Sequence, residues 1–154
     1  MYGAGAAKIG SIVGGGAKEG QEILARFYKN TPSLARLMST VKTIAEKGYV
    51  PGLDGRRILI RSEHAALNSL LQGCGAIIAK QWCIEAHKKF SELSLPVKQV
   101  AFVHDEIQIE TKEKHGAQVA QIMCESATEA GIVLGFRCPV DAESKIGKNW
   151  FDTH

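Results

Sequence analysis

The sequence predicts an α+β fold in which several helices pack on a small antiparallel sheet. Apolar residues recur at helical spacing through several long segments, and two other segments carry the turn residues and β-forming residues of hairpins. The length of 154 residues, with 45% hydrophobic and 23% charged residues, is enough for one ordinary globular core.

The chain begins with a glycine-rich stretch that is followed by two predicted helices. Because glycine is so frequent before residue 17, this stretch is expected to be a loop with at most one short helix, over residues 6–13. The next two helices are expected over residues 17–29 and 33–47, separated at Pro32 and ended by Gly48.

Residues 49–61 are predicted to form a hairpin. Asp54-Gly55 is a turn pair, and Ile58, Leu59 and Ile60 favour a strand. The turn is followed by Arg56 and Arg57. Arginine holds phosphate bidentately, so these cations are candidates for contacts with a nucleic-acid backbone; the alternative is a solvated hairpin end.

Residues 63–90 are predicted to form a long helix with an apolar stripe and a separate polar strip. His64, Asn68 and Gln72 recur every four residues, about 6 Å apart along the axis, beside the small residues Gly75 and Ala79. Such amides can donate to the minor-groove acceptors that all base pairs share. The alternative is an ordinary hydrated face. The apolar stripe comprises Ala66, Leu67, Leu70, Leu71, Cys74, Ile77 and Ile78.

A second hairpin is expected over residues 100–110, with His104 and Asp105 in its turn. Two-residue turns prefer Asn-Gly or Gly-Gly, so turn chemistry alone does not account for these residues. An imidazole beside the carboxylates of Asp105 and Glu106 suits a hard divalent cation near a phosphate. The alternative is a tolerated turn residue beside a surface imidazole.

The remaining elements are a helix over residues 113–133, a short strand near residues 136–140 and an irregular tail. The four cysteines have neither C-x-x-C spacing nor finger-like histidines, so no zinc site or disulfide framework is indicated and a reducing, cytosolic setting is expected. No apolar run approaches the ~18 residues of a membrane span. The net charge of +3 permits nucleic-acid binding without arguing for it.

Taken together, four motifs resemble family A DNA polymerases in order and spacing. The tail Gly147-Lys148-Asn149-Trp150 is similar to the C-terminal end of the short-tailed-phage replicative enzymes, so the resemblance covers essentially the whole chain. The motifs are Tyr2-Gly3-Ala4-Gly5, Gly52-Leu53-Asp54-Gly55-Arg56, His64-Ala65-Ala66-Leu67-Asn68-Ser69-Leu70-Leu71-Gln72 and Val103-His104-Asp105-Glu106.

The resemblance implies a role for each motif. Asp105 would bind the catalytic Mg²⁺ ions, with Glu106 as a weaker ligand or nearby carboxylate and His104 at the primer end. Tyr2 would lie beside the templating base at the end of the fingers helix, followed by Gly3. The other DNA contacts would come from the minor-groove face and the hairpin arginine, namely His64, Asn68, Gln72 and Arg56.

By the same resemblance, residues 1–48 derive from the fingers and residues 49–154 from the palm. The family's other metal-binding aspartate, and the arginine and lysine that hold the incoming dNTP, lie upstream of a pair like Tyr2-Gly3. Asp141, Glu143 and Asp152 have no spacing that marks them as substitutes. The chain is therefore expected not to polymerise alone, and to need an N-terminal segment or subunit together with primer-template DNA and dNTP.

Two other functions compete with a polymerase. One is a non-catalytic duplex-DNA-binding module or inactive polymerase remnant that kept the minor-groove helix. The other, a small metal-dependent nuclease, is disfavoured because the sequence shows no second cluster of carboxylates. If a phage encodes the polymerase, it is expected to act in the host cytoplasm, away from any membrane.

Overall fold

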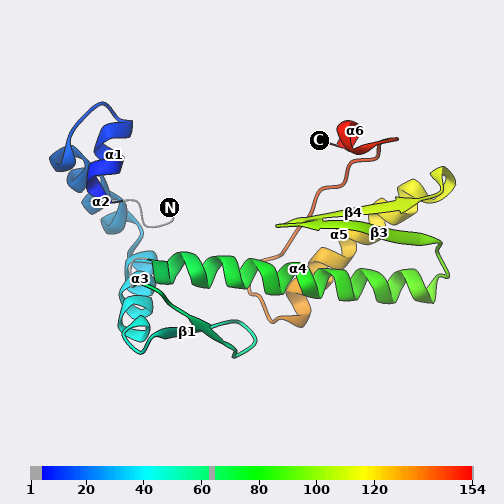
Figure 1. The fold of residues 1–154 in the computed structure, drawn as a ribbon, viewed down its shortest axis with the longest axis horizontal. Coiled ribbons are helices and arrows are strands. Elements are labelled where there is room, and N and C mark those ends of the chain that lie inside the picture. Colours follow the sequence, from blue (N-terminus) through cyan, green and yellow to red (C-terminus); the bar gives the residue numbers. More distant parts are fainter. Residues whose placement is uncertain (1–4, 63–64, 154) are drawn as a thin grey trace. The chain divides into compact units, whose positions relative to one another are not determined.

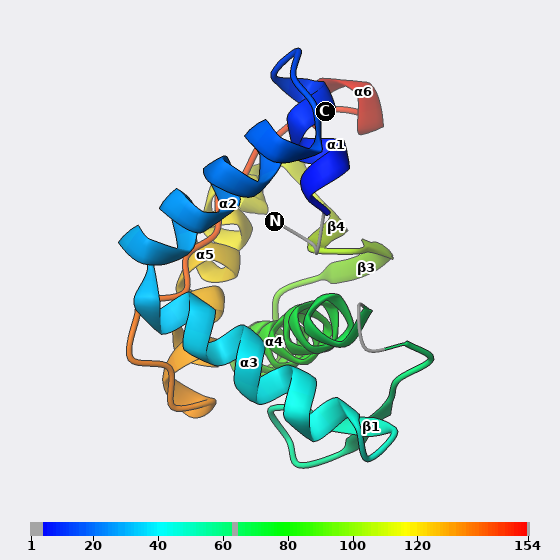
Figure 2. The same cartoon turned by 90° about the vertical axis from the view of Figure 1, so that its left-hand side faces the viewer.

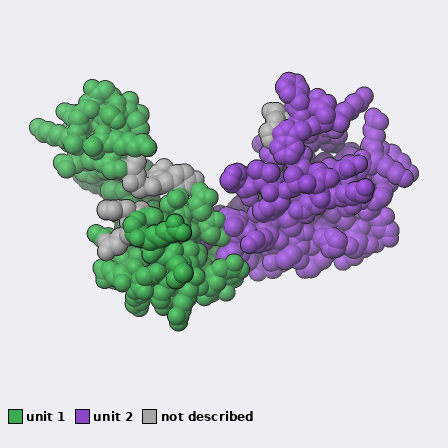
Figure 3. All heavy atoms as spheres, in the orientation of Figure 1, with its two compact units in different colours: residues 1–73 green, residues 74–154 purple. Residues whose placement is uncertain are grey.

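The structure, a computed structural model, describes residues 5–62 and 65–153. These residues are mainly helical and include two separate two-stranded antiparallel sheets (Figure 1). The predicted α+β class is confirmed, although the strands form two small sheets. The chain divides into two compact units, residues 1–73 and 74–154 (Figure 3). This division concerns compactness, so the boundary between fingers and palm at residue 48 stays a prediction.

Two helices of the first unit, α1 (Ala6–Ile12) and α2 (Ala17–Asn30), lie side by side in Figures 1 and 2. Both predicted helices are confirmed. Glycines allow the close approach, because a Cβ atom at Gly10 would overlap the carbonyl group of Gly16 and one at Gly20 would overlap that of Ala6. Gly10 of the glycine-rich start and Gly20 of α2 are both buried, so part of that start packs like an interior segment.

The first core joins helix α3 (Pro32–Ala45) to the hairpin of β1 (Tyr49–Pro51) and β2 (Arg57–Leu59). Proline at the first helical position fixes a suitable φ and has no N–H to leave unpaired, so it starts α3. Gly48 follows the helix with a φ of 81°, which turns the chain into β1. The buried members of this core are Val41, Ala45, Val50, Ala66 and Leu67.

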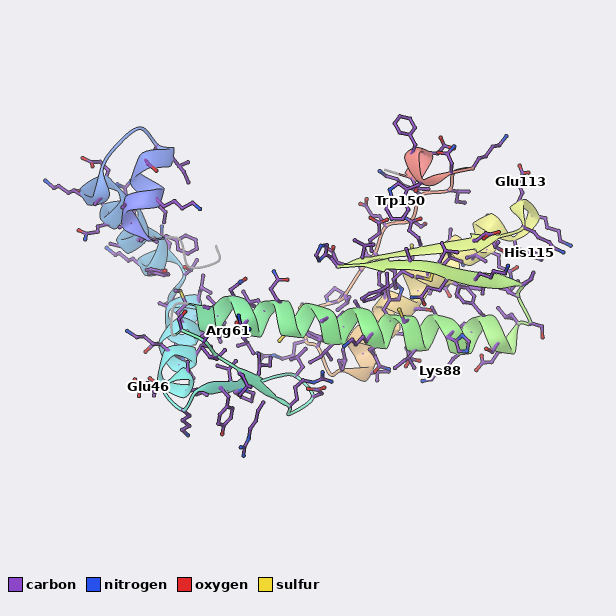
Figure 4. All side chains as sticks on the ribbon, viewed as in Figure 1. Glu46, Arg61, Lys88, Glu113, His115 and Trp150 are labelled. Atoms are coloured by element: carbon purple, nitrogen blue, oxygen red, sulfur yellow. The ribbon has the colours of Figure 1, made fainter. Side chains whose placement is uncertain are left out.

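The long predicted helix is α4 (Ala66–Glu92), whose first turns belong to the first unit and whose remainder belongs to the second. The apolar stripe is buried at Ala66, Leu67 and Ile77, whereas Leu71 is 43% exposed. Near the other end, Lys88, labelled in Figure 4, binds the buried carboxylate of Glu85 at 2.9 Å. The Lys88 ammonium lowers the pKa of Glu85, because it donates a hydrogen bond to the charged form.

The second unit packs the hairpin of β3 (Val97–Val103) and β4 (Glu106–Thr111) with α4 and α5 (Gly116–Val133). A 3₁₀ turn, Glu113–His115, leads into α5, so the predicted hairpin and helix are confirmed. The indole N–H of Trp82 donates to the Met123 carbonyl at 2.7 Å and ties α4 to α5. The buried core comprises Ala86, Phe90, Val119, Ile122 and Met123, with Ile107 and Ile109 of β4 packed against it.

The predicted strand over residues 136–140 is wrong. This segment is irregular, and the next regular element is the short helix α6 (Trp150–Thr153). Gly135 has a φ of 71°, and Pro139 has no N–H for a ladder. The side chain of Val140 packs on the bare backbone of Gly131, 2.7 Å from where a Cβ would lie. Val140 is thus apolar because it covers α5, without belonging to a sheet.

Candidate metal-binding and DNA-binding sites

The β3–β4 hairpin carries His104 and Asp105 at its tip. Val103 pairs with Glu106 across the strands, so His104 and Asp105 alone form the turn between them. His104 has a φ of 56°, and Ser94 is the only other non-glycine residue with positive φ in the described part of the chain. Glycine is usual at such a position, so the histidine backbone is strained. The predicted turn is confirmed, and its conformation is one that histidine does not favour.

The acidic groups of this tip differ in their surroundings. His104 and Asp105 are exposed, whereas Glu106 is half-buried and accepts a hydrogen bond from the side-chain amide of Gln108. Within residues 5–62 and 65–153, no residue donates a hydrogen bond or forms an ion pair to the Asp105 carboxylate. Behind the tip, Ile107 anchors β4 to the second core. The hairpin therefore holds an accessible carboxylate on an anchored strand, and carboxylate oxygen is a preferred ligand of Mg²⁺.

The described residues of the tip do not by themselves form a metal site. Among the described residues, no three His, Cys, Asp or Glu side chains lie close enough together to hold a metal ion. Asp152, a carboxylate in the tail, instead accepts hydrogen bonds from the Lys148 backbone N–H at 2.9 Å and from the Asn149 amide at 3.1 Å. Asp105 and Glu106 have the oxygen chemistry that Mg²⁺ requires, and further ligands would have to come from outside the described residues.

The loop of the β1–β2 hairpin is closed by its backbone. The Gly55 N–H donates to the Gly52 carbonyl at 3.0 Å, and the Gly52 N–H donates to the Arg56 carbonyl at 2.8 Å. Gly55 has a φ of 80°, a conformation that glycine adopts without steric cost. Asp54 completes the turn, because its Oδ1 accepts the Arg56 backbone N–H at 3.2 Å.

The same aspartate also binds the Arg56 side chain. Arg56 Nε donates to Asp54 Oδ2 at 2.6 Å, and Arg56 Nη2 lies 2.5 Å from that oxygen. The guanidinium lowers the pKa of Asp54, and the carboxylate in turn raises the pKa of Arg56. The neighbouring Arg57 guanidinium lies 4.8 Å from the centre of the Tyr49 ring. The sequence predicts only a turn role for Asp54. The Asp-x-Arg spacing in a tight turn was the signal that could have predicted this side-chain ion pair.

The structure describes only some residues of the predicted minor-groove strip. Tyr2, Gly3 and His64 lie outside the described residues. Asn68 is half-buried and Gln72 exposed, one helical repeat apart on the first turns of α4. Their spacing places both amides on one face of the helix. Further along the strip, Ala79 is buried in the second unit, so the hydrated face does not extend unbroken to it.

Sequence comparison relates the whole chain to one family. The profile of DNA polymerase family A matches residues 1–152. The DNA-directed DNA polymerase of Escherichia phage T7 is 38% identical and that of Enterobacteria phage T3 is 37% identical, each over 100% of this chain and 25% of the relative. The DNA-directed DNA polymerase of Escherichia phage Phieco32 is 36% identical. The chain thus spans about a quarter of the length of the curated relatives that it matches.

Fold comparison finds a solved structure with a similar fold. The POL domain of Pol1 from M. smegmatis, solved in complex with DNA primer-template and dNTP, matches with a TM-score of 0.77 at 23% identity. The match covers 92% of this chain and 26% of that structure. No helix in the described part of this chain is long and apolar enough to cross a membrane. The family profile, which accounts for nearly every residue, shows that this chain belongs to DNA polymerase family A.

Proposed function

We propose that this chain forms the C-terminal part of a DNA-directed DNA polymerase and works together with an N-terminal segment or subunit. The phage relatives are DNA-directed DNA polymerases of about four times the matched length. The chain would provide part of the fingers over residues 1–48 and much of the palm over residues 49–154. The N-terminal segment or subunit would provide the second catalytic aspartate and the arginine and lysine that bind the dNTP.

The observation that carries this proposal is the exposed Asp105 at the tip of an anchored hairpin. Asp105 would be the chain's main ligand for the catalytic Mg²⁺ ions, and Glu106 would be a weaker ligand or a nearby carboxylate. When bound, Mg²⁺ activates the attacking hydroxyl and stabilises the charge that develops during phosphoryl transfer. His104 would contact the primer end, and its strained position at the tip supports a role other than forming the turn.

Apart from His104, the DNA-binding residues would lie on two elements of the first unit and at the N-terminus. Asn68 and Gln72 would donate to minor-groove acceptors without reading sequence. Arg56 would contact the nucleic-acid backbone near the primer terminus. The exposure of Gln72 and Arg56 supports these assignments. Tyr2 and Gly3 are proposed on the family resemblance alone, and His64 on that resemblance together with its four-residue spacing from Asn68 in the sequence.

The test is to reconstitute the chain with a polypeptide that provides the rest of a family A polymerase. The chain alone should incorporate no nucleotide, and the reconstituted enzyme should extend a primer in the presence of Mg²⁺. Asp105→Ala should reduce incorporation by about 10³-fold or more, while duplex binding by the chain stays unchanged. Glu110→Ala, an exposed carboxylate on the same strand, is the matched control and should retain activity.

The outcomes separate the competing functions. Incorporation that survives Asp105→Ala would overturn the metal-binding role of this residue. Duplex binding without incorporation in any reconstitution would favour the non-catalytic module or remnant, because the added polypeptide supplies the second catalytic aspartate that a two-metal site needs.

A further inference from the structure

The Arg56 guanidinium is engaged along one edge only. It has five N–H donors, and Asp54 Oδ2 lies within 2.6 Å of Nε and 2.5 Å of Nη2. In the described part of the chain, no other acceptor is hydrogen-bonded to the Arg56 side chain. The end of the guanidinium that carries Nη1 therefore keeps its donors, and arginine uses paired donors to bind phosphate oxygens.

The ion pair is not needed to close the loop. Two backbone hydrogen bonds and the positive φ of Gly55 already form the turn, and the pair itself is open to solvent, with side-chain exposures of 57% for Arg56 and 32% for Asp54. Exposed ion pairs contribute little to stability. What the contact does change is the freedom of Arg56: one carboxylate holds both its backbone N–H and its guanidinium.

The adjacent arginine is held in a different way. Arg57 begins β2, opposite Pro51, and its guanidinium lies over the Tyr49 ring of the partner strand. The hairpin thus carries two neighbouring cations, of which one is braced by a carboxylate and the other rests on an aromatic ring.

We propose that Asp54 is a positioning residue that orients the Arg56 guanidinium for a phosphate of the bound DNA duplex. The inference rests on the proposed function, in which Arg56 contacts the nucleic-acid backbone. A side chain that is ordered before binding loses less entropy when the phosphate arrives, so affinity increases. The neighbouring cation supplies an internal comparison, because Arg57 does not bind Asp54.

The sign of the effect makes the proposal testable. Removing a negative charge should by itself strengthen binding to a polyanion, whereas removing a positioning residue should weaken it. The experiment measures binding of the full chain to a short fluorescent DNA duplex for wild type, Asp54→Ala, Arg56→Ala, Arg57→Ala, and each arginine variant combined with Asp54→Ala. Thermal unfolding of each variant checks that it is folded, and Asp54→Asn, which keeps an acceptor for the backbone N–H, serves as a second variant.

We expect Arg56→Ala to weaken binding about tenfold and Asp54→Ala to weaken it about threefold. In the Arg56→Ala background, Asp54→Ala should cause no further loss, whereas in the Arg57→Ala background the threefold loss should persist. Asp54→Asn should weaken binding in the same direction and by less.

Four results would overturn the inference. Tighter binding by Asp54→Ala in the wild-type background would make Asp54 a repelling charge. An equal loss with and without Arg56 would make its role purely structural. If Arg56→Ala binds the duplex as tightly as the wild type does, Arg56 makes no phosphate contact, and Asp54 has no such contact to position. If the wild-type chain binds no duplex at all, there is no phosphate contact for Asp54 to position and the inference is overturned, whereas the proposed function is still tested separately by primer extension in the reconstituted enzyme.

Discussion

The two hairpins of this chain treat their charged side chains in opposite ways. In the β1–β2 hairpin, Arg56 and Arg57 are both engaged within the hairpin, by Asp54 and by the Tyr49 ring. In the β3–β4 hairpin, Asp105 is exposed and no described residue bonds to its carboxylate. Under the proposed function, the first arrangement would orient a cation for a phosphate, and the second would leave the carboxylate oxygen atoms available for a metal ion.

The hairpins also differ in backbone strain. The first has glycine at its positive-φ position, Gly55, and the second has histidine, His104. Strain at a non-glycine residue persists only where the surrounding structure enforces it. The turn of the first hairpin is thus unstrained, whereas the second hairpin has a histidine side chain at a position where it makes the turn less stable.

The largest effect that we expect on stability concerns the anchoring of the first hairpin. Val50 is 1% exposed, whereas Leu59 of the same hairpin is 81% exposed. Val50→Ala should lower the free energy of unfolding by about 2 kcal/mol, and Leu59→Ala, the matched control, should change it by less than about 0.5 kcal/mol. Urea unfolding measures both variants. An equally large loss for Leu59→Ala would show that the outer side of β2 is covered.

A smaller effect should follow from relieving the strained turn of the second hairpin. His104→Gly should raise the free energy of unfolding by about 1 kcal/mol, because glycine adopts positive φ freely. Ser94→Gly, at a φ of 50°, should stabilise the chain similarly. Only His104→Gly should reduce primer extension by the reconstituted enzyme. A loss of stability for His104→Gly would contradict the assignment of strain to this turn.

The smallest effect should come from the Asp54–Arg56 pair. Because the folded chain lowers the pKa of Asp54, the pair stabilises the chain above the usual aspartate pKa, and this contribution disappears as pH falls through and below about 4. Asp54→Asn should therefore make stability slightly less dependent on acid pH. Glu85→Gln is a useful comparison, because Lys88 lowers the pKa of the Glu85 side chain, which is only 8% exposed. Unfolding curves recorded from pH 7 to 3 measure how the free energy of unfolding depends on pH. This dependence should weaken more in Glu85→Gln than in Asp54→Asn.

Local sequence patterns predicted most of the fold. The helices α2 to α5 and both hairpins follow from apolar spacing and turn residues, which act over a few neighbouring positions. The strand near residue 138 was predicted wrongly because β-forming residues such as Val140 also suit packing on a helix. The separation of the strands into two sheets depends on contacts between distant segments, which local patterns do not encode.

The candidate sites were predictable to different degrees. The position of His104 and Asp105 in a two-residue turn followed from the alternation of Ile107 and Ile109 with polar residues. The bond between Asp54 and the Arg56 side chain was not foreseen, because Asp54-Gly55 already had a sufficient role as a turn pair. The roles in DNA and metal binding were predicted from residue chemistry together with the family resemblance, and they stay predictions.

The contact between α1 and α2 has a consequence for mutational tolerance. Gly10 and Gly20 leave no space for even one methyl group, so an alanine at either position would force the backbones apart. Gly5 and Gly14 have nothing near the point where a Cβ would be. The composition alone does not distinguish these four glycines. We nevertheless expect substitutions to be rejected at Gly10 and Gly20 and to be far better accepted at Gly5. At Gly14 only the φ of 75° should limit them.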